Sequence, residues 1–97
     1  MAFVQLIEFR TSQPDEMRKV ADEWEKATEG KRKTRRRVVA QDRDDPGRHF
    51  IVVFFDSYEE AMENSSLPET EAFSKKMMSF AEGAPTFYNL DIVDDRS

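Results

Sequence analysis

The sequence predicts a single α+β domain over residues 1–97, with elements in the order β-α-β-β-α-β. Short apolar blocks of strand character alternate with segments whose apolar residues recur at helical spacing. The two halves of the chain also correspond, since Ile7 and Ser12 of the first match Val52 and Ser57 of the second. Such a split β-α-β pair forms a four-stranded antiparallel sheet with both helices on one face, in the ferredoxin-like arrangement.

The segment His49–Phe55 is the strand around which we expect the sheet to form. Side chains of a strand point alternately to its two faces. Both alternating sets are apolar here: Phe50, Val52 and Phe54 in one, and Ile51, Val53 and Phe55 in the other. Helices cover only one face of such a sheet, and a bare apolar face is unusual on a monomer. We therefore expect a homodimer with sheets packed face to face, its interface formed by the second set: Ile51, Val53 and Phe55.

The first half of the chain reads as a strand, a helix and a second strand. The first strand is expected over 3–9, and Ser12 with Asp15 resembles a capping box in which Pro14 suits the first turn. The helix has one apolar stripe, formed by Met17, Val20, Ala21, Trp24 and Thr28. The second strand, expected over 33–42, is more polar and suits a sheet edge. The turn Asp42–Arg48 then joins it to the central strand as a hairpin.

The second half begins with a capping box at Ser57 and Glu60, which starts a short helix reaching about Asn64. A new helix is expected to begin with Ser66 as its cap. Its apolar stripe is formed by Phe73, Met77, Phe80 and Ala81. Gly83 and Pro85 end this helix, and the last strand is expected over 86–93.

A basic run, Lys31–Arg37, holds six charges in seven residues. It could bind phosphate or nucleic acid, with Lys33, Arg35 and Arg37 as an anion ladder on one strand face. The net charge of −5 and the lack of aromatic residues within the run argue against nucleic acid. We expect a solvated or ion-paired edge, partly neutralised by the acidic residues of the turn that follows: Asp42, Asp44 and Asp45.

Composition excludes several classes of protein. There is no cysteine, so neither a disulfide framework nor thiolate chemistry is expected. His49 is the only histidine, and no carboxylates have metal-ligand spacing, so no metal site is predicted. No apolar run approaches the roughly 20 residues that span a bilayer, and the N-terminus lacks the pattern of a secretory signal. A cytoplasmic protein without a membrane partner is expected.

The strand order, the helix interrupted at residues 64–68 and the helix Glu69–Ala81 leading into Thr86 resemble the dimeric α/β-barrel superfamily, in particular small proteins of the antibiotic-biosynthesis-monooxygenase type. The resemblance spans residues 2–93. It implies a homodimeric barrel that binds a small aromatic or hydrophobic molecule. The enzymes of the family include monooxygenases that use no cofactor. The haem-degrading branch is not favoured, because Ile7 stands where that branch has asparagine and Met77 near its histidine.

The resemblance does not supply a catalytic set for this chain. The expected ligand pocket lies between sheet and helices, and its candidate lining residues are Trp24, Asn64, Phe73, Met77 and Tyr88. Trp24 can equally be a core residue, because apolar helix stripes usually pack on a sheet. Two functions remain open: cofactor-independent oxygenation of a flat substrate, with the substrate supplying the electrons, and a dimeric binding or stress-related module without turnover.

Overall fold

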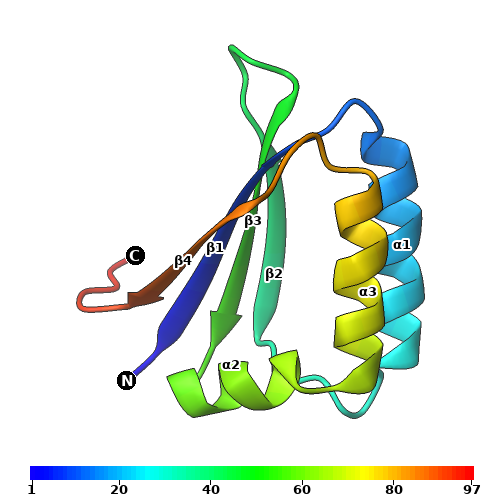
Figure 1. Ribbon diagram of the computed structural model, residues 1–97. Helices are drawn as coiled ribbons and strands as arrows, with labels where there is room; N and C mark the ends of the chain where they lie inside the picture. The colour runs from blue at the N-terminus through cyan, green and yellow to red at the C-terminus, as the bar shows by residue number, and fades with distance from the viewer.

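Two long helices lie over one face of an antiparallel sheet, and a third, shorter helix crosses its end in the computed structural model, which describes residues 1–97 (Figure 1). The elements are β1 (Phe3–Arg10), α1 (Pro14–Ala27), β2 (Arg36–Gln41), β3 (Arg48–Phe55), α2 (Tyr58–Ser65), α3 (Pro68–Ser79) and β4 (Thr86–Asp91). This confirms the ferredoxin-like α+β fold, with the second helical region divided in two. No helix is long and apolar enough to cross a membrane.

The four strands lie in the order β2-β3-β1-β4, so the two most apolar strands are central, as predicted. All three pairings are antiparallel. Ile7 of β1 lies opposite Ile51 of β3, and on the outer strands the same row continues to Val39 and Phe87. Directly opposite residues point to the same face, so the pairing decides which side chains meet the helices.

The face beneath the helices carries the core of the protomer. Phe3, Ile51, Val53 and Phe55 are only 2–8% exposed and cluster with Met17 and other residues. This corrects the expected dimer interface, because Ile51, Val53 and Phe55 are already buried within one chain. The opposite set of side chains lies on the open face. The alternation of side chains along β3 could not show which of its two apolar faces meets the helices. The helical connections between the strands decide this, because they lie on one side of the sheet.

The open face of the sheet is a continuous apolar surface. Its residues are half-buried or exposed in the single chain, and Tyr88 and Leu90 are 40% and 44% exposed. The pairing places the following side chains on it: Val4, Leu6, Val38, Phe50, Val52, Phe54, Tyr88 and Leu90. We call this set the open face. Glu8 and Arg48 form an ion pair at its margin, with Nε and Oε2 2.9 Å apart.

Two of the three expected helix caps are wrong, and proline explains both. The Ser57 hydroxyl accepts a hydrogen bond from the Glu60 amide at 3.2 Å, which confirms the cap of α2. The N-caps of α1 and α3 are instead Gln13 and Leu67, each immediately before a proline. A residue before proline is driven out of the helical region, so the helix begins at the proline itself. Ser12 and Ser66 therefore do not cap α1 and α3, and Ser66 is instead the C-cap of α2, where its hydroxyl donates to the Met62 carbonyl oxygen at 2.9 Å.

Both outer strands are shorter than expected, and β2 starts late because the basic run is mostly loop. β2 begins at Arg36, and β4 ends at Asp91. The run is ion-paired, as predicted, but to α2, α3 and the end of β3 instead of the acidic turn: Lys31 with Glu69, Lys33 with Glu63 and Arg35 with Asp56. The anion ladder does not form, since only one of its three members, Arg37, lies in the strand.

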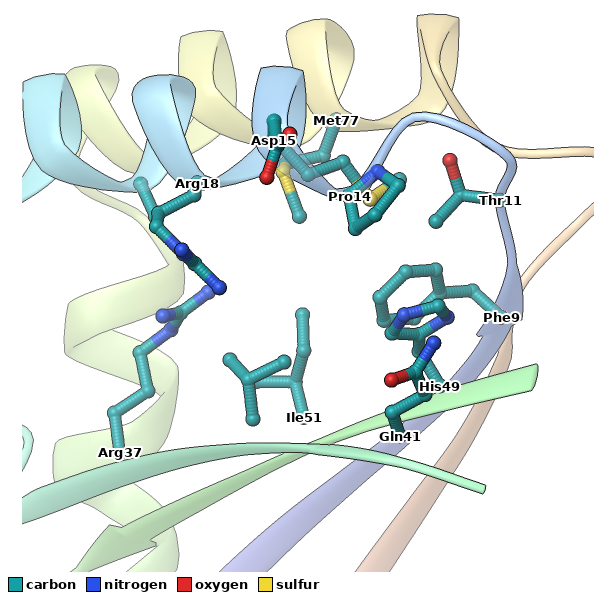
Figure 2. Close-up of a pocket in the computed structure, with 13 residues that line it drawn as sticks. Phe9, Thr11, Pro14, Asp15, Arg18, Arg37, Gln41, His49, Ile51 and Met77 are labelled. Carbon is teal, nitrogen blue, oxygen red and sulfur yellow. The ribbon is translucent and has the colours of Figure 1, made fainter. Parts of the chain in front are cut away.

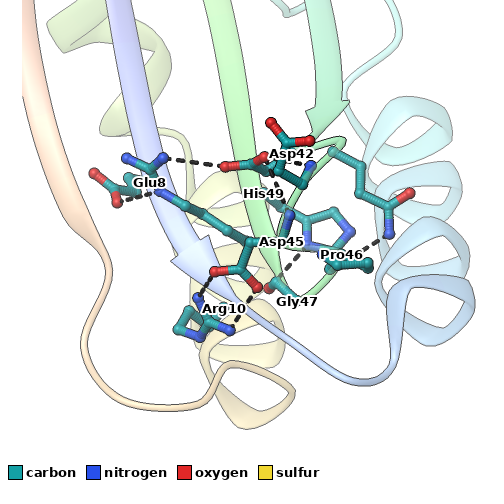
Figure 3. A network of polar contacts seen from close by, with 10 residues as sticks. Glu8, Arg10, Asp42, Asp45, Pro46, Gly47 and His49 are labelled. Atoms are coloured by element: carbon teal, nitrogen blue, oxygen red, sulfur yellow. Dashed lines mark hydrogen bonds and ion pairs between the residues drawn. The ribbon is translucent and has the colours of Figure 1, made fainter.

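The acidic turn between β2 and β3 is held by its own polar network (Figure 3). Asp45 accepts two hydrogen bonds from the Arg10 guanidinium, at 2.7 and 3.0 Å. Asp42 accepts from the amides of Asp44 and Asp45 and from Arg48. These contacts lower the pKa of both carboxyls: for Asp42 chiefly the Asp44 amide and then Arg48, and for Asp45 chiefly Arg10. The network thereby ties the hairpin to β1.

Acid is expected to weaken this hairpin. A carboxyl whose folded pKa is lowered contributes stability above its unfolded pKa of about 4, and loses it as the pH falls through the folded value. The melting temperature should therefore drop below about pH 4, and less steeply in Asp42→Asn, which cannot ionise. Because these groups are exposed, the difference should be a few degrees at most. Thermal melts between neutral and acidic pH test it, and parallel curves for both proteins would contradict it.

Candidate functional site

Three adjoining cavities occupy the space between the sheet and the helices. One of about 270 Å³ opens between α1 and β2, a second of about 330 Å³ lies toward α2, α3 and β4, and a smaller third lies under α3. All three share Ile51 as a lining residue. They exist because the helices cover the central strands and leave the helix-side residues of both edges bare: Val39 is 51% and Phe87 56% exposed.

Trp24 forms the aromatic wall of the second cavity. Its ring lies 5.3 Å from that of Phe73 on α3, centroid to centroid, at a tilt of 31°. The indole nitrogen donates to the Thr70 hydroxyl at 3.0 Å, which fixes the ring orientation. The ring is 8% exposed and lines the cavity. Trp24 is therefore a buried residue that also lines a cavity, and its contact with a ligand stays a prediction.

Asn64 presents a polar group to the same cavity. Its side chain is buried, and its Oδ1 accepts a hydrogen bond from the Lys33 amide at 3.2 Å. An N–H group can only donate, so this contact fixes the orientation of the side-chain amide. The amide nitrogen has no partner within the chain, and Asn64 lines the second cavity. It is available to donate to a ligand oxygen.

Arg37 stands between the first two cavities and lines both. Its guanidinium lies 5.9 Å from the ring centroid of Trp24 and 5.7 Å from that of Phe73. No carboxylate lies within ion-pairing distance of it. Burial lowers the pKa of Arg37, and the charge of Glu25 opposes this in part. The cavity thus contains a fixed positive charge beside aromatic faces.

His49 lines the first cavity from β3 (Figure 2). It is buried, and its ring stacks on Phe9 with centroids 5.4 Å apart. Nδ1 lies 3.2 Å from the Gly47 carbonyl oxygen, which can only accept, so Nδ1 carries a proton. In the neutral imidazole Nε2 is then an acceptor that makes no hydrogen bond within the chain. A ligand hydroxyl could donate to it.

The structure brings together four of the five predicted lining residues. Trp24, Asn64 and Phe73 line the second cavity, and Met77 lines the first and the third. Tyr88 is on the other side of the sheet, opposite Leu6, and its hydroxyl donates to Glu8 at 3.3 Å. Side chains of β4 point alternately to the two faces of the sheet, and the pairing of Tyr88 with Leu6 of β1 puts Tyr88 on the open face.

Arg37, His49 and Phe87 were not among the predicted pocket residues. Each lies on the same face of the sheet as Ile51. These residues could therefore have been predicted once it was known which face the helices cover. No group of three or more histidine, cysteine, aspartate or glutamate side chains is arranged to hold a metal ion. The polar groups that line the first two cavities include the Asn64 amide, the His49 imidazole, two guanidinium groups and the carboxylates of Asp15 and Glu71, a set that suits binding and proton transfer.

No family model matches the chain, and no curated protein does. Solved structures match it over nearly its whole length. A proposed antibiotic biosynthesis monooxygenase from Caulobacter crescentus superimposes with a TM-score of 0.82 at 14% identity, covering 96% of this chain and 91% of that one. Another from Chloroflexus aurantiacus gives 0.77 at 20%, covering 100% and 98%. SnoaB, a cofactor-independent oxygenase from Streptomyces nogalater, gives 0.82 at 8%, covering 97% and 95%. At these identities the likeness shows a shared fold.

Proposed function

We propose that this protein binds a flat aromatic molecule between its sheet and helices and oxygenates it without metal or flavin. The observation that carries the proposal is the second cavity, where the rings of Trp24 and Phe73 form one wall and Asn64, whose amide N–H has no partner within the chain, belongs to the lining. Ligand pockets are typically apolar with a few placed polar groups. The shared fold with a cofactor-independent oxygenase adds support to the reaction type.

The reaction we assign uses the substrate as the electron donor. An activated methylene flanked by aromatic rings loses a proton, and the resulting carbanion reduces O₂ and forms a carbon–oxygen bond. The hydroperoxide then loses water, so that CH₂ and O₂ become C=O and H₂O. We assign acceptance of the proton to Nε2 of His49, which lines the adjoining first cavity, and donation to the developing oxyanion to the Asn64 amide in the second.

Binding can be measured directly, because Trp24 is the only tryptophan. Titration with anthraquinone-2-carboxamide, a neutral flat quencher, should quench its fluorescence. Phe73→Ala removes a ring beside Trp24 and should weaken binding about tenfold, the upper value for one aromatic contact. Tyr88→Leu alters the opposite face and should leave the affinity unchanged. Equal affinities in both variants, or no quenching at all, would contradict the assigned pocket.

Turnover is tested with anthrone, which has an activated methylene. Oxygen uptake and anthraquinone formation should rise above the rate without protein, at one O₂ per quinone. His49→Gln should lower this added rate while anthrone still binds. The second candidate function, a binding module without turnover, is favoured by one observation: Asn64 is already used to hold the Lys33 backbone. Binding of the carboxamide without any added oxygen uptake would select it.

We also propose that the protein is a homodimer joined through the open face. That face is uncovered in the single chain, and its apolar residues adjoin the Glu8–Arg48 ion pair. Arg48 also lies 4.8 Å from the ring centroid of Phe50, which leaves a polar margin beside an apolar centre. Native mass spectrometry should show twice 11.4 kDa. An added aromatic mass would identify the bound molecule.

A further inference from the structure

Two arginines approach each other at the first cavity. Arg18 extends from α1 and Arg37 from β2, and the tips of their guanidinium groups point toward one another across the opening (Figure 2). They come from different elements, yet both line the same cavity. Such convergence of two like charges is unfavourable unless something of opposite charge lies between or beside them.

The chain itself does not neutralise this pair. Neither arginine has a carboxylate within ion-pairing distance, whereas Arg10, Arg35 and Arg48 all do. Asp15 also lines the cavity, but it makes no ion pair with either of them. Burial lowers the pKa of Arg37 and the charge of Glu25 opposes this only in part, so this guanidinium has lost hydration without forming an ion pair.

The rest of the cavity restricts what an anion there can be. About half of its lining is apolar, including Met17, Val39, Ile51 and Met77, and its polar lining residues other than the arginines include His49, Gln41 and Asp15. The aromatic rings of Trp24 and Phe73 begin beside Arg37, on the side of the second cavity. A free inorganic anion would use only the charged end. A flat aromatic body with an acidic group at one edge would use both.

We infer that the ligand is an aromatic carboxylate, whose acid group lies between Arg18 and Arg37 while its rings enter the cavities between sheet and helices. Guanidinium groups bind carboxylates through paired, charge-assisted hydrogen bonds. The inference rests on the proposed function for the cavity, and adds to it the class of the ligand and the residues that recognise it.

Two matched probes separate this inference from the proposed function. Anthraquinone-2-carboxylate and anthraquinone-2-carboxamide differ only in charge, and both are followed by quenching of Trp24. The wild-type protein should bind the carboxylate more tightly. Arg37→Met and Arg18→Met should each weaken carboxylate binding by roughly ten- to a hundredfold, the usual value of a hydrogen bond to a charged group. Binding of the carboxamide should weaken much less than that of the carboxylate, because the neutral probe loses no charge-assisted hydrogen bond.

Two further variants serve as controls. Arg43→Met removes an equal charge from the exposed turn and should leave both affinities unchanged. Arg37→Lys keeps the charge but loses the planar guanidinium group, so its affinity for the carboxylate should lie between those of wild type and Arg37→Met. This variant also replaces Arg37→Met if the latter fails to fold. Equal binding of both probes, unaltered in the variants, would overturn the inference and leave the aromatic pocket intact. Binding of neither probe would overturn both.

Discussion

An aspartate at Val53 is expected to unfold the chain, whereas an aspartate at the preceding position, Val52, should leave the fold intact and separate the proposed dimer. Val53 is 8% exposed and belongs to the core cluster beneath the helices. An unpaired charge there should cost about 4 kcal/mol or more, a large part of the roughly 5–15 kcal/mol by which domains are stable. Circular dichroism and thermal melts should show the loss.

Val52 lies on the open face, opposite Leu6 and Val38. In a face-to-face dimer, an aspartate there faces apolar surface and the aspartate of the partner. Like charges brought together at an interface cost several kcal/mol, so the dissociation constant should rise roughly a hundredfold or more. Light scattering should then report a folded monomer. A wild-type protein that is monomeric at micromolar concentration would refute the dimer, and an unfolded Val52→Asp would refute the assignment of faces.

Trp24→Ala is expected to have the next largest effect, on stability and on binding together. The side chain is buried, packs on Phe73 and bonds to Thr70. Removing a buried aromatic side chain typically costs about 3–5 kcal/mol. Trp24→Phe keeps most of the ring and loses the hydrogen bond, so it should cost only about 1 kcal/mol. Urea titrations followed by circular dichroism measure both.

Calorimetry with anthraquinone-2-carboxamide tests the second role of Trp24, since these variants lack the fluorescent reporter. Trp24→Phe should retain binding, because a ring still faces Phe73. Trp24→Ala should lose most of it, even at a temperature where the variant is fully folded. If Trp24→Ala bound the probe as well as wild type, Trp24 would be a core residue only, and the pocket would lie elsewhere.

Much of the fold followed from local features of the chain. Apolar blocks of strand length identified β1 and β3, and their low polarity correctly indicated central strands. The helix signals were also local, and Ser57 caps α2 as its spacing with Glu60 predicted. Where a proline lay close after the expected cap, the restriction of the residue before it prevailed over side-chain preference, and α1 and α3 begin at Pro14 and Pro68.

The pocket was predictable only in part. An apolar stripe on a helix indicates which side chains face the sheet, whereas a strand with two apolar faces does not indicate which face meets the helices. Trp24, Phe73 and Met77 lie on helices that have only one apolar side, so their direction followed from the sequence. Tyr88 lies on a strand, and Arg37 belongs to a basic run whose other members are ion-paired in loops. Their positions depend on which neighbours the strands pair with.

By itself, the sequence determined the order of the elements, the two central strands and the existence of a second apolar face needing cover. Those properties arise from residues close together in the chain. Only the tertiary structure decided which face the helices cover, and with it the fate of Ile51, Val53 and Phe55 in the core and of Tyr88 outside the pocket. The reason is that β3 is apolar on both sides, so its alternation is equally compatible with either orientation until distant segments pack against it.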